Sequence, residues 1–201
     1  MASHPAHPGA VHPTPGGRAE PAASDRLFLG VFPEAKAQLT IVDVANAYLR
    51  AQAMRATPQH SSRLHVTVHH LGDYAELLPE TVEAALAAMA QIQSPRWTMV
   101  LDRLTGFPGQ PRHYPIVLNC ASRGAHVLWR ESRSLLEAAG FSRWLERSYS
   151  PHMTLFHADR LPPAPIPIQP ILWPVREVVL VHSLMGKGTY RVLGTRQLMD
   201  A

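Results

Sequence analysis

Residues 63–72 form an alternating stretch that constrains the fold more than any other part of the sequence. Aliphatic residues there alternate with polar ones, a period of two that predicts a half-buried β-strand. Residues two apart in a strand point to the same face, roughly 6.5–7 Å apart along the chain. His65 and Thr67 are therefore expected side by side on one face, with the aliphatic side chains turned to the core.

The same unit returns at residues 150–156, where His152 and Thr154 share one predicted face. Each His-x-Thr is followed by an aliphatic residue, and the two histidines are 87 positions apart, a spacing that suits two halves of one domain. A third His-x-Thr, at residues 12–14, lies among prolines and glycines, where a strand is not expected. Two strands that each carry an imidazole and a hydroxyl could converge on one small anion.

Alternation and helical spacing along the rest of the chain predict the element order β-α-β-α-β-β-α-β-β-β. The predicted strands are 26–32, 63–72, 96–105, 114–120, 152–157, 176–185 and 189–198, and the predicted helices are 34–54, 80–93 and 123–139. Residues 159–174 are rich in proline and are expected to be extended without forming a central strand. The succession of strand, helix and His-x-Thr strand occurs twice. It predicts an α+β fold with two similar lobes facing each other across a cleft.

Composition sets the limits of the domain. Residues 1–24 are rich in Pro, Gly, Ala and His and are expected to be a disordered tail. Residues 25–201 are expected to form a single bilobal domain, since a chain of 201 residues can bury one good core. The formal charge of +4 suits an anionic ligand such as RNA or a nucleotide, and it equally suits an ordinary solvated surface.

Cys120 is the only cysteine, so no disulfide or cysteine zinc site can form within the chain. A reducing compartment is indicated, and we expect a cytoplasmic location. No apolar run approaches the ~18 residues of a membrane span, and no membrane association is expected. We also expect the protein to be a monomer.

Two imidazoles can together catalyse the attack of water on a phosphodiester. One takes a proton from the water and the other gives a proton to the leaving oxygen, and the ordinary histidine pKa near 6.5 suits both tasks. Threonine hydroxyls can donate to the non-bridging oxygens, where negative charge must be held. This chemistry needs neither a metal nor a cofactor, and the sequence contains no Walker loop, Gly-x-Gly-x-x-Gly or His-Glu-x-x-His motif.

The ordered set of motifs resembles the 2H phosphoesterase superfamily, which is defined by two His-x-Thr-aliphatic motifs. Within it, the chain is most similar to the RNA 2′,3′-cyclic phosphodiesterase family, also called 2′-5′ RNA ligases. The resemblance covers roughly residues 25–200. It rests on Arg-Leu-Phe-Leu-Gly-Val near the start, Leu-His-Val-Thr-Val, Ser-Pro-His-Met-Thr-Leu, and the closing Val-Val-Leu-Val-His-Ser and Tyr-Arg-Val-Leu segments.

The resemblance implies antiparallel sheets around a central cleft with helices packed outside. It implies hydrolysis of an RNA 2′,3′-cyclic phosphate end to a 2′-phosphate, and the reverse 2′-5′ ligation. By position, His65 matches the proton donor to the leaving oxygen and His152 the proton acceptor that activates water. Thr67 and Thr154 match the phosphate-binding hydroxyls. The implied partners are RNA ends or nucleotide cyclic phosphates.

The chain departs from the family where similar members often carry Arg shortly after each motif. His157 stands where such an arginine is expected, so substrate binding could be weaker, dependent on pH or aimed at another ligand. In a regular strand His69 shares the face of His65 and would contact the ligand, whereas His70 would pack inward or lie at the strand edge. Phe156, on the presumed face of His152, could stack on a base or simply pack in the core.

Two alternatives stay open. The first is a 2H phosphodiesterase with another substrate, such as a 2′-5′ oligoadenylate or a small nucleotide cyclic phosphate. The second is a histidine-based metal- or RNA-binding protein without catalysis, which would hold zinc or nickel when purified. The strand spacing gives no recognisable closed set of metal ligands.

Overall fold

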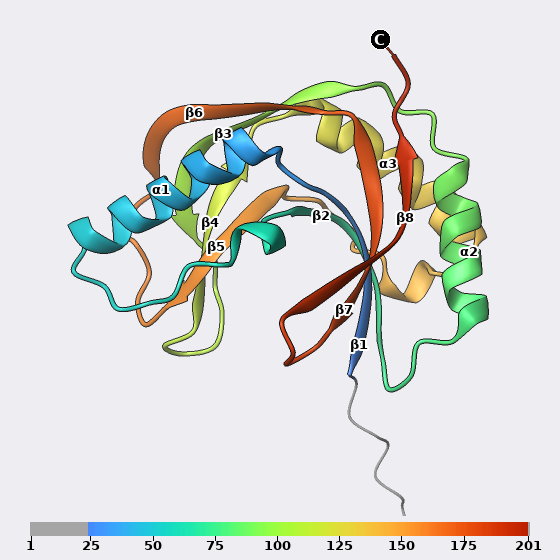
Figure 1. Cartoon of the computed structure of the whole chain (residues 1–201), viewed down its shortest axis with the longest axis horizontal. Helices are drawn as coiled ribbons and strands as arrows, with labels where there is room; N and C mark the ends of the chain where they lie inside the picture. The colour runs from blue at the N-terminus through green and yellow to red at the C-terminus, as the bar shows by residue number, and fades with distance from the viewer. Residues whose placement is uncertain (1–23, 201) are drawn as a thin grey trace, which may run out of the picture.

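The two His-x-Thr segments lie next to each other in the middle of one sheet (Figure 1). This computed structural model describes residues 24–200, so the predicted tail lies outside the described residues except for Ser24. The strands are β1 (Asp25–Val31), β2 (Val66–Tyr74), β3 (Trp97–Gly106), β4 (Tyr114–Cys120), β5 (His152–Ala158), β6 (Ile166–Val175), β7 (Glu177–Leu184) and β8 (Thr189–Gln197). The helices are α1 (Ala35–Ala51), α2 (Pro79–Ala90) and α3 (Arg123–Ala138), with short 3₁₀ turns η1 (Ser61–Arg63) and η2 (Ser142–Trp144).

The sheet is antiparallel throughout and consists of two halves. Its strand order is β6-β3-β4-β5-β2-β1-β7-β8. Strands β2 and β5 join the halves, and only one pair of residues, Val66 and Met153, is in register between them. The predicted α+β class is confirmed, and the two lobes are the two halves of one continuous sheet.

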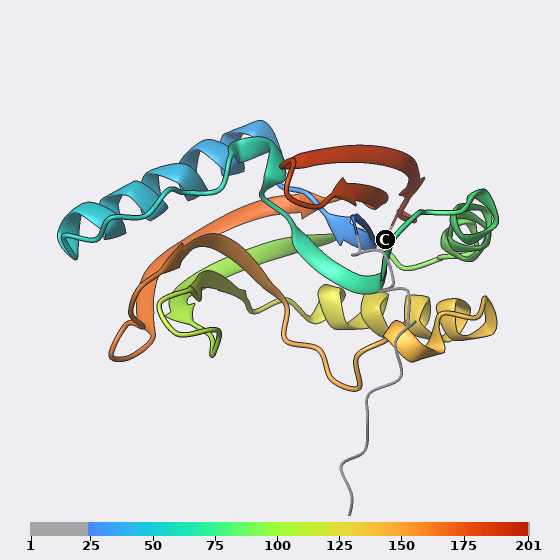
Figure 2. The same cartoon turned by 90° about the horizontal axis from the view of Figure 1, so that it is seen from below.

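Helices cross from one half of the sheet to the other. Helix α1 connects β1 to β2 in the first half but packs against β5 and β6 in the second. Helix α3 connects β4 to β5 in the second half and packs against β2 in the first, as well as against β3. Figure 2 shows the strands curving between α1 and α3. The predicted succession of strand, helix and His-x-Thr strand is confirmed, because it occurs as β1, α1 and β2 and again as β4, α3 and β5.

One apolar core runs through both halves. Ile41 of α1, Leu128 of α3 and the joining residues Val66 and Met153 have no exposed surface and belong to the same cluster. Each such side chain contributes roughly 1.5–3 kcal/mol by leaving water. The helices thus fix the angle between the halves as well as cover them. In the described part of the chain, no helix has the length and apolarity needed to cross a membrane.

Strand β6 was not predicted as a strand, and its place in the sheet explains why. It is the edge strand beside β3, and it carries Pro167, Pro170 and Pro174. Proline lacks the N–H that a central strand needs and is accepted at an edge. The expectation that this segment is extended but not central is correct. The stretch from 166 onward is nevertheless a paired strand.

Candidate active site

A bulge follows the threonine in each His-x-Thr motif. In the β1–β2 pairing, Gly30 faces Thr67 and Leu29 faces His69, which leaves Val68 without a partner. In the β4–β5 pairing, the register shifts in the same way and leaves Leu155 unpaired. An extra residue reverses the alternation of all side chains beyond it. The histidine and the threonine of each motif therefore share their face with the third residue after that threonine.

The bulges change the expected faces of His69 and Phe156. His69 was expected on the face of His65, but it is 2% exposed and its Nε2 lies 3.0 Å from both the Trp129 carbonyl and the Ser132 hydroxyl of α3. Phe156 is 1% exposed and stacks on Tyr48 of α1, so it is a core residue and presents no free face for a base.

Because each bulge shifts the alternation by one residue, His70 and His157 lie where His69 and Phe156 were expected, on the face of their motif threonine. Both line the same cavity as His65, Thr67 and Thr154. His70 was expected to pack inward or lie at the strand edge, whereas the structure places it in the lining of this cavity. The two motifs share one pattern, His-x-Thr-x-x-His, at residues 65–70 and 152–157. In both motifs, a second histidine follows the threonine by three residues. This shared spacing was a sequence signal for His70 and His157, which are called the outer histidines below, because it suggests a common role.

The first histidine of each motif, His65 or His152, is oriented by a backbone carbonyl two residues before it. The Nδ1 atom of His65 lies 2.7 Å from the carbonyl oxygen of Arg63, and the Nδ1 atom of His152 lies 2.7 Å from that of Ser150. A carbonyl oxygen only accepts hydrogen bonds, so each Nδ1 must carry the proton and donate it. In the neutral ring this leaves the lone pair on Nε2. Each imidazole can then accept a proton, or deliver one after being protonated, through the same atom.

Aromatic rings surround His65. Phe28 and Phe32 lie with ring centroids 4.8 and 5.6 Å from the imidazole, and Tyr190 meets it edge-on at 5.5 Å. This burial lowers the pKa of His65 to about 4, and the positive charges of Arg63 and His152 lower it further, while the Arg63 carbonyl opposes the shift. In the free protein at neutral pH, His65 is therefore uncharged.

The cavity beside His65 has a volume of about 510 Å³ and is cationic. It is lined by Arg26, Phe28, Gln59, Arg63, His65, Thr67, His70, Thr154, His157, Ser183 and Tyr190. No carboxylate is among these residues. The guanidinium of Arg63 lies over the Tyr190 ring at 5.0 Å, and its buried Nε atom has no hydrogen-bond partner within residues 24–200. Such a cavity is suited to an anion that offers several oxygen atoms.

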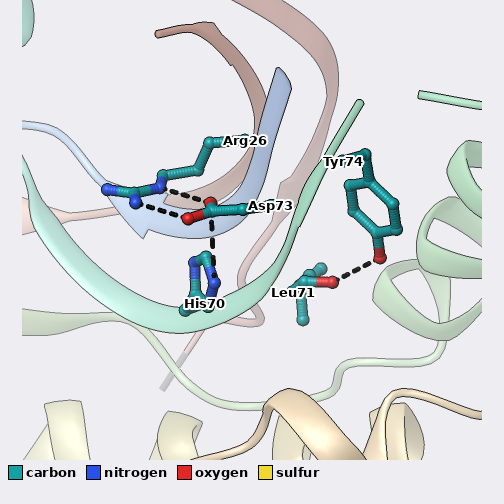
Figure 3. A network of polar contacts seen from close by, with 5 residues as sticks. All are labelled: Arg26, His70, Leu71, Asp73 and Tyr74. Carbon is teal, nitrogen blue, oxygen red and sulfur yellow. Dashed lines mark hydrogen bonds and ion pairs between the residues drawn. The ribbon is translucent and has the colours of Figure 1, made fainter. Parts of the chain in front are cut away.

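Asp73 contacts two basic side chains, Arg26 and His70, at the edge of this cavity (Figure 3). Its carboxylate accepts two hydrogen bonds from Arg26, both 2.7 Å long, and lies 3.7 Å from Nε2 of His70. The hydrogen bonds from Arg26 lower the pKa of Asp73, which keeps it ionised. Burial lowers the pKa of His70, although the Asp73 charge acts in the opposite direction. Arg26 is thus a fixed cation, a role that motif reasoning did not assign to it.

In the other half of the sheet, His157 forms no ion pair with a carboxylate among residues 24–200. His157 stacks flat on His113, with ring centroids 4.1 Å apart and an angle of 4° between the planes. Burial and the neighbouring His113 both lower the pKa of His157. The outer histidines are therefore mainly neutral near pH 7, so Arg26 and Arg63 supply the permanent charge of the cavity.

A second cavity, of about 410 Å³, adjoins the first and contains His152. It is lined by Thr67, Val68, His69, His70, Trp129, Glu146, Ser148, Tyr149, Ser150 and His152. Thr67 and His70 line both cavities. The first cavity thus holds His65 and Thr154, the second holds His152, and the two meet at Thr67. The four residues singled out by the motifs therefore line two cavities that have Thr67 and His70 in common.

The proton position and the pKa of His65 can be measured by nuclear magnetic resonance. We expect the imidazole to be neutral and protonated on Nδ1 down to about pH 4 in the free protein. Inorganic phosphate is expected to raise this pKa by about 1–3 units, because a nearby anion favours the charged ring. A free-protein midpoint near 6.5, or a proton on Nε2, would show that burial and the Arg63 carbonyl do not control this ring.

An antiparallel α+β fold with paired histidine and threonine residues at the joint of two halves defines a 2H phosphoesterase. A sequence profile of the 2′-5′ RNA ligase superfamily matches residues 33–186. The chain belongs to this superfamily, which places it among phosphodiesterases in general. A comparison with curated proteins finds no match.

Solved structures show the same architecture. The crystal structure of TT0787 of Thermus thermophilus is 25% identical, with a TM-score of 0.71, over 87% of this chain and 98% of that one. E. coli LigT in complex with 3′-AMP is 24% identical, with a TM-score of 0.69, over 88% of this chain and 99% of LigT. Kluyveromyces marxianus Usb1 is similar in fold, at 13% identity and a TM-score of 0.51, over 84% of this chain and 96% of Usb1. Among residues 24–200, no three His, Cys, Asp or Glu residues gather where they could hold a metal ion.

Proposed function

We propose that this protein opens RNA 2′,3′-cyclic phosphate ends to 2′-phosphates without a metal. The observation that supports this most directly is the matched placement of His65 and His152. In each ring, Nδ1 is bonded to a backbone carbonyl, which leaves the lone pair of the neutral imidazole on Nε2, and each ring is partly buried. Thr67 lines a cavity with each of the two histidines. Members of the superfamily named in the comparisons include LigT crystallised with phosphate and with 3′-AMP.

In the proposed reaction, the cyclic phosphate lies where the two cavities meet. Thr67 and Thr154 donate hydrogen bonds to its non-bridging oxygens, and Nε2 of His152 takes a proton from the attacking water. The new P–O bond forms as the bond from phosphorus to the ribose O3′ breaks, and Nε2 of His65 gives its proton to O3′. His65 is neutral in the free protein, so the bound phosphate anion must first raise its pKa and promote its protonation.

The direct test is hydrolysis of a short RNA that ends in a 2′,3′-cyclic phosphate, with and without a chelator. The expected product is the 2′-phosphate alone, identified by its phosphorus resonance, at a rate that the chelator leaves unchanged. Formation of the 3′-phosphate, or a requirement for added metal, would contradict the proposed mechanism. Metal analysis of the purified protein tests the metal-binding alternative in the same preparation.

A second candidate is a smaller substrate, such as a mononucleotide cyclic phosphate or a 2′-5′ oligoadenylate. The two outer histidines favour it. At neutral pH His70 and His157 carry less positive charge than arginines would, so they attract the further phosphates of a longer RNA less strongly. A panel that compares kcat/KM for short RNA ends with that for mononucleotides separates the two candidates. Equal values would mean that the chain beyond the terminal nucleotide makes no contact.

A further inference from the structure

A third hollow, of about 490 Å³, lies beside the turn between β7 and β8. It is lined by Arg26, Arg63, Ser183, Leu184, Met185, Gly186, Lys187 and Gly188. Arg26, Arg63 and Ser183 also line the cavity of His65, so the two spaces are neighbours. Within the described residues, no carboxylate lines either of them. The third hollow is therefore a cationic extension of the cavity of His65, and none of the four motif residues lines it.

Two of the three cations in this hollow have no ionic partner. Arg26 donates two hydrogen bonds to Asp73, which offsets its charge. Neither Arg63 nor Lys187 forms an ion pair with any residue from 24 to 200. Cations without a counterion attract an anion, and the attraction is stronger in a recess than on a flat surface. The excess positive charge of the hollow is thus that of Arg63 and Lys187.

Two glycines leave room around Lys187 in the β7–β8 turn. Gly186 and Gly188 have φ angles of 75° and 65°, a region that favours glycine. A β-carbon at Gly186 would meet no atom within 4 Å, and one at Gly188 would lie 3.5 Å from Nη1 of Arg63. The guanidinium of Arg63 therefore reaches the turn that carries Lys187. An anion bound between them could contact both side chains.

The proposed reaction indicates which part of the substrate reaches this hollow. Displacement at phosphorus places the entering and leaving oxygens on roughly opposite sides. The leaving O3′ lies toward His65, so the ribose that carries it lies on the same side, in the cavity that Arg26 and Arg63 line. The 5′-oxygen of this ribose is the next position at which a nucleotide carries a phosphate. A hollow that shares residues with the cavity of His65 is the neighbouring place for that phosphate.

We propose that the third hollow binds the phosphate on the 5′-oxygen of the terminal nucleoside, with Arg63 and Lys187 as its main cations. This rests on the proposed function. The phosphate can be the linkage to the preceding nucleotide of an RNA or the free 5′-phosphate of a mononucleotide. Both offer oxygens to a guanidinium, an ammonium and the Ser183 hydroxyl. The enzyme then selects for a phosphate at this position rather than for chain length, and Lys187 is a specificity-determining residue remote from the reacting atoms.

Binding of products tests the site without turnover. Titration calorimetry on the native protein compares a nucleoside 2′-phosphate with the nucleoside 2′,5′-bisphosphate and with a 3′-5′-linked dinucleotide that ends in a 2′-phosphate. We expect both larger compounds to bind about tenfold more tightly than the nucleoside 2′-phosphate, and Lys187→Ala to reduce each advantage to about twofold. Lys36 is the only other lysine of the chain, is exposed on α1 and lines none of the three spaces. Lys36→Ala removes the same charge and should preserve both advantages.

The site is overturned if neither larger compound has an advantage, if Lys187→Ala preserves the advantages, or if Lys36→Ala removes them equally. An advantage that depends on Lys187 for only one compound supports the site and identifies the source of its phosphate. In kinetic assays, the ratio of kcat/KM for a 5′-phosphorylated cyclic nucleotide to that for its 5′-hydroxyl counterpart should fall about fivefold in Lys187→Ala. If the Lys187-dependent advantage is present but no cyclic phosphate is hydrolysed, the site stands and the proposed function fails. Hydrolysis without that advantage gives the opposite result.

Discussion

Replacing His152 with alanine is expected to lower the rate of cyclic phosphate hydrolysis by about 10²–10⁴, because it removes the group proposed to take the proton from water. The same loss is expected for His65→Ala, which removes the proposed donor to O3′. The measurement is kcat/KM from the release of 2′-phosphate, with circular dichroism to establish folding. Ser134→Ala, on the exposed face of α3, is the control and should retain activity.

The double variant discriminates between a working pair and two independent residues. If His65 and His152 act in one displacement, removing both should cost little more than removing either, since groups that act as a unit are strongly non-additive. The alternative of a non-catalytic binding protein would be favoured if each single variant retained full turnover. Loss in only one of the two variants would refute the paired mechanism and leave a single acid or base.

Acid is expected to destabilise the fold well above the pH at which carboxylates titrate. Burial lowers the pKa of both His65 and His69 to about 4, whereas an unfolded histidine has a pKa of 6.5. Above pH 6.5, both states are neutral and the fold has its full stability. As the pH falls from 6.5 to 4, the unfolded chain takes up protons that the folded protein does not. The free energy of unfolding therefore falls by about 3 kcal/mol for each residue.

The lowered pKa values of His70 and His157 act in the same direction. Asp25 and Asp73 have pKa values lowered from 3.8, so their contribution is lost only at lower pH, outside this window. Urea unfolding at several pH values between 7.5 and 4.5 measures the effect. His69→Gln removes one titrating group and should flatten the curve. The explanation is wrong if the free energy of unfolding is constant between pH 7 and 5, or if His69→Gln leaves the curve unchanged.

Much of the framework follows from sequence periodicity. Alternation predicts the strands because one face of each is buried, and the helical segments have clear apolar stripes. Gly140 has a positive φ of 91° just beyond α3, as expected for a residue that ends a helix. The repeated connection from strand to helix to motif strand is also visible, since it requires only the order of elements.

The face of the strand on which each site residue lies could not be predicted from periodicity. Val68 and Leu155 are aliphatic and fit the alternating pattern, so nothing local marks them as bulged. The bulges arise from pairing with β1 and β4, which are distant in sequence. Arg26 was missed for a related reason. Its role depends on the pairing of β1 with β2, which brings it opposite Asp73.

The joint between β2 and β5 has one further consequence. Because a single residue pair connects the halves, backbone hydrogen bonding alone does little to set the separation of the two imidazoles. That separation is instead governed by α1 and α3, each of which reaches across to the opposite half. The packing of these two helices therefore sets the distance between the two motif strands. A change of side-chain volume on the inner surface of α1, at Ile41 for example, would be transmitted to the reaction centre as a change in gap width, without touching any group that meets the substrate.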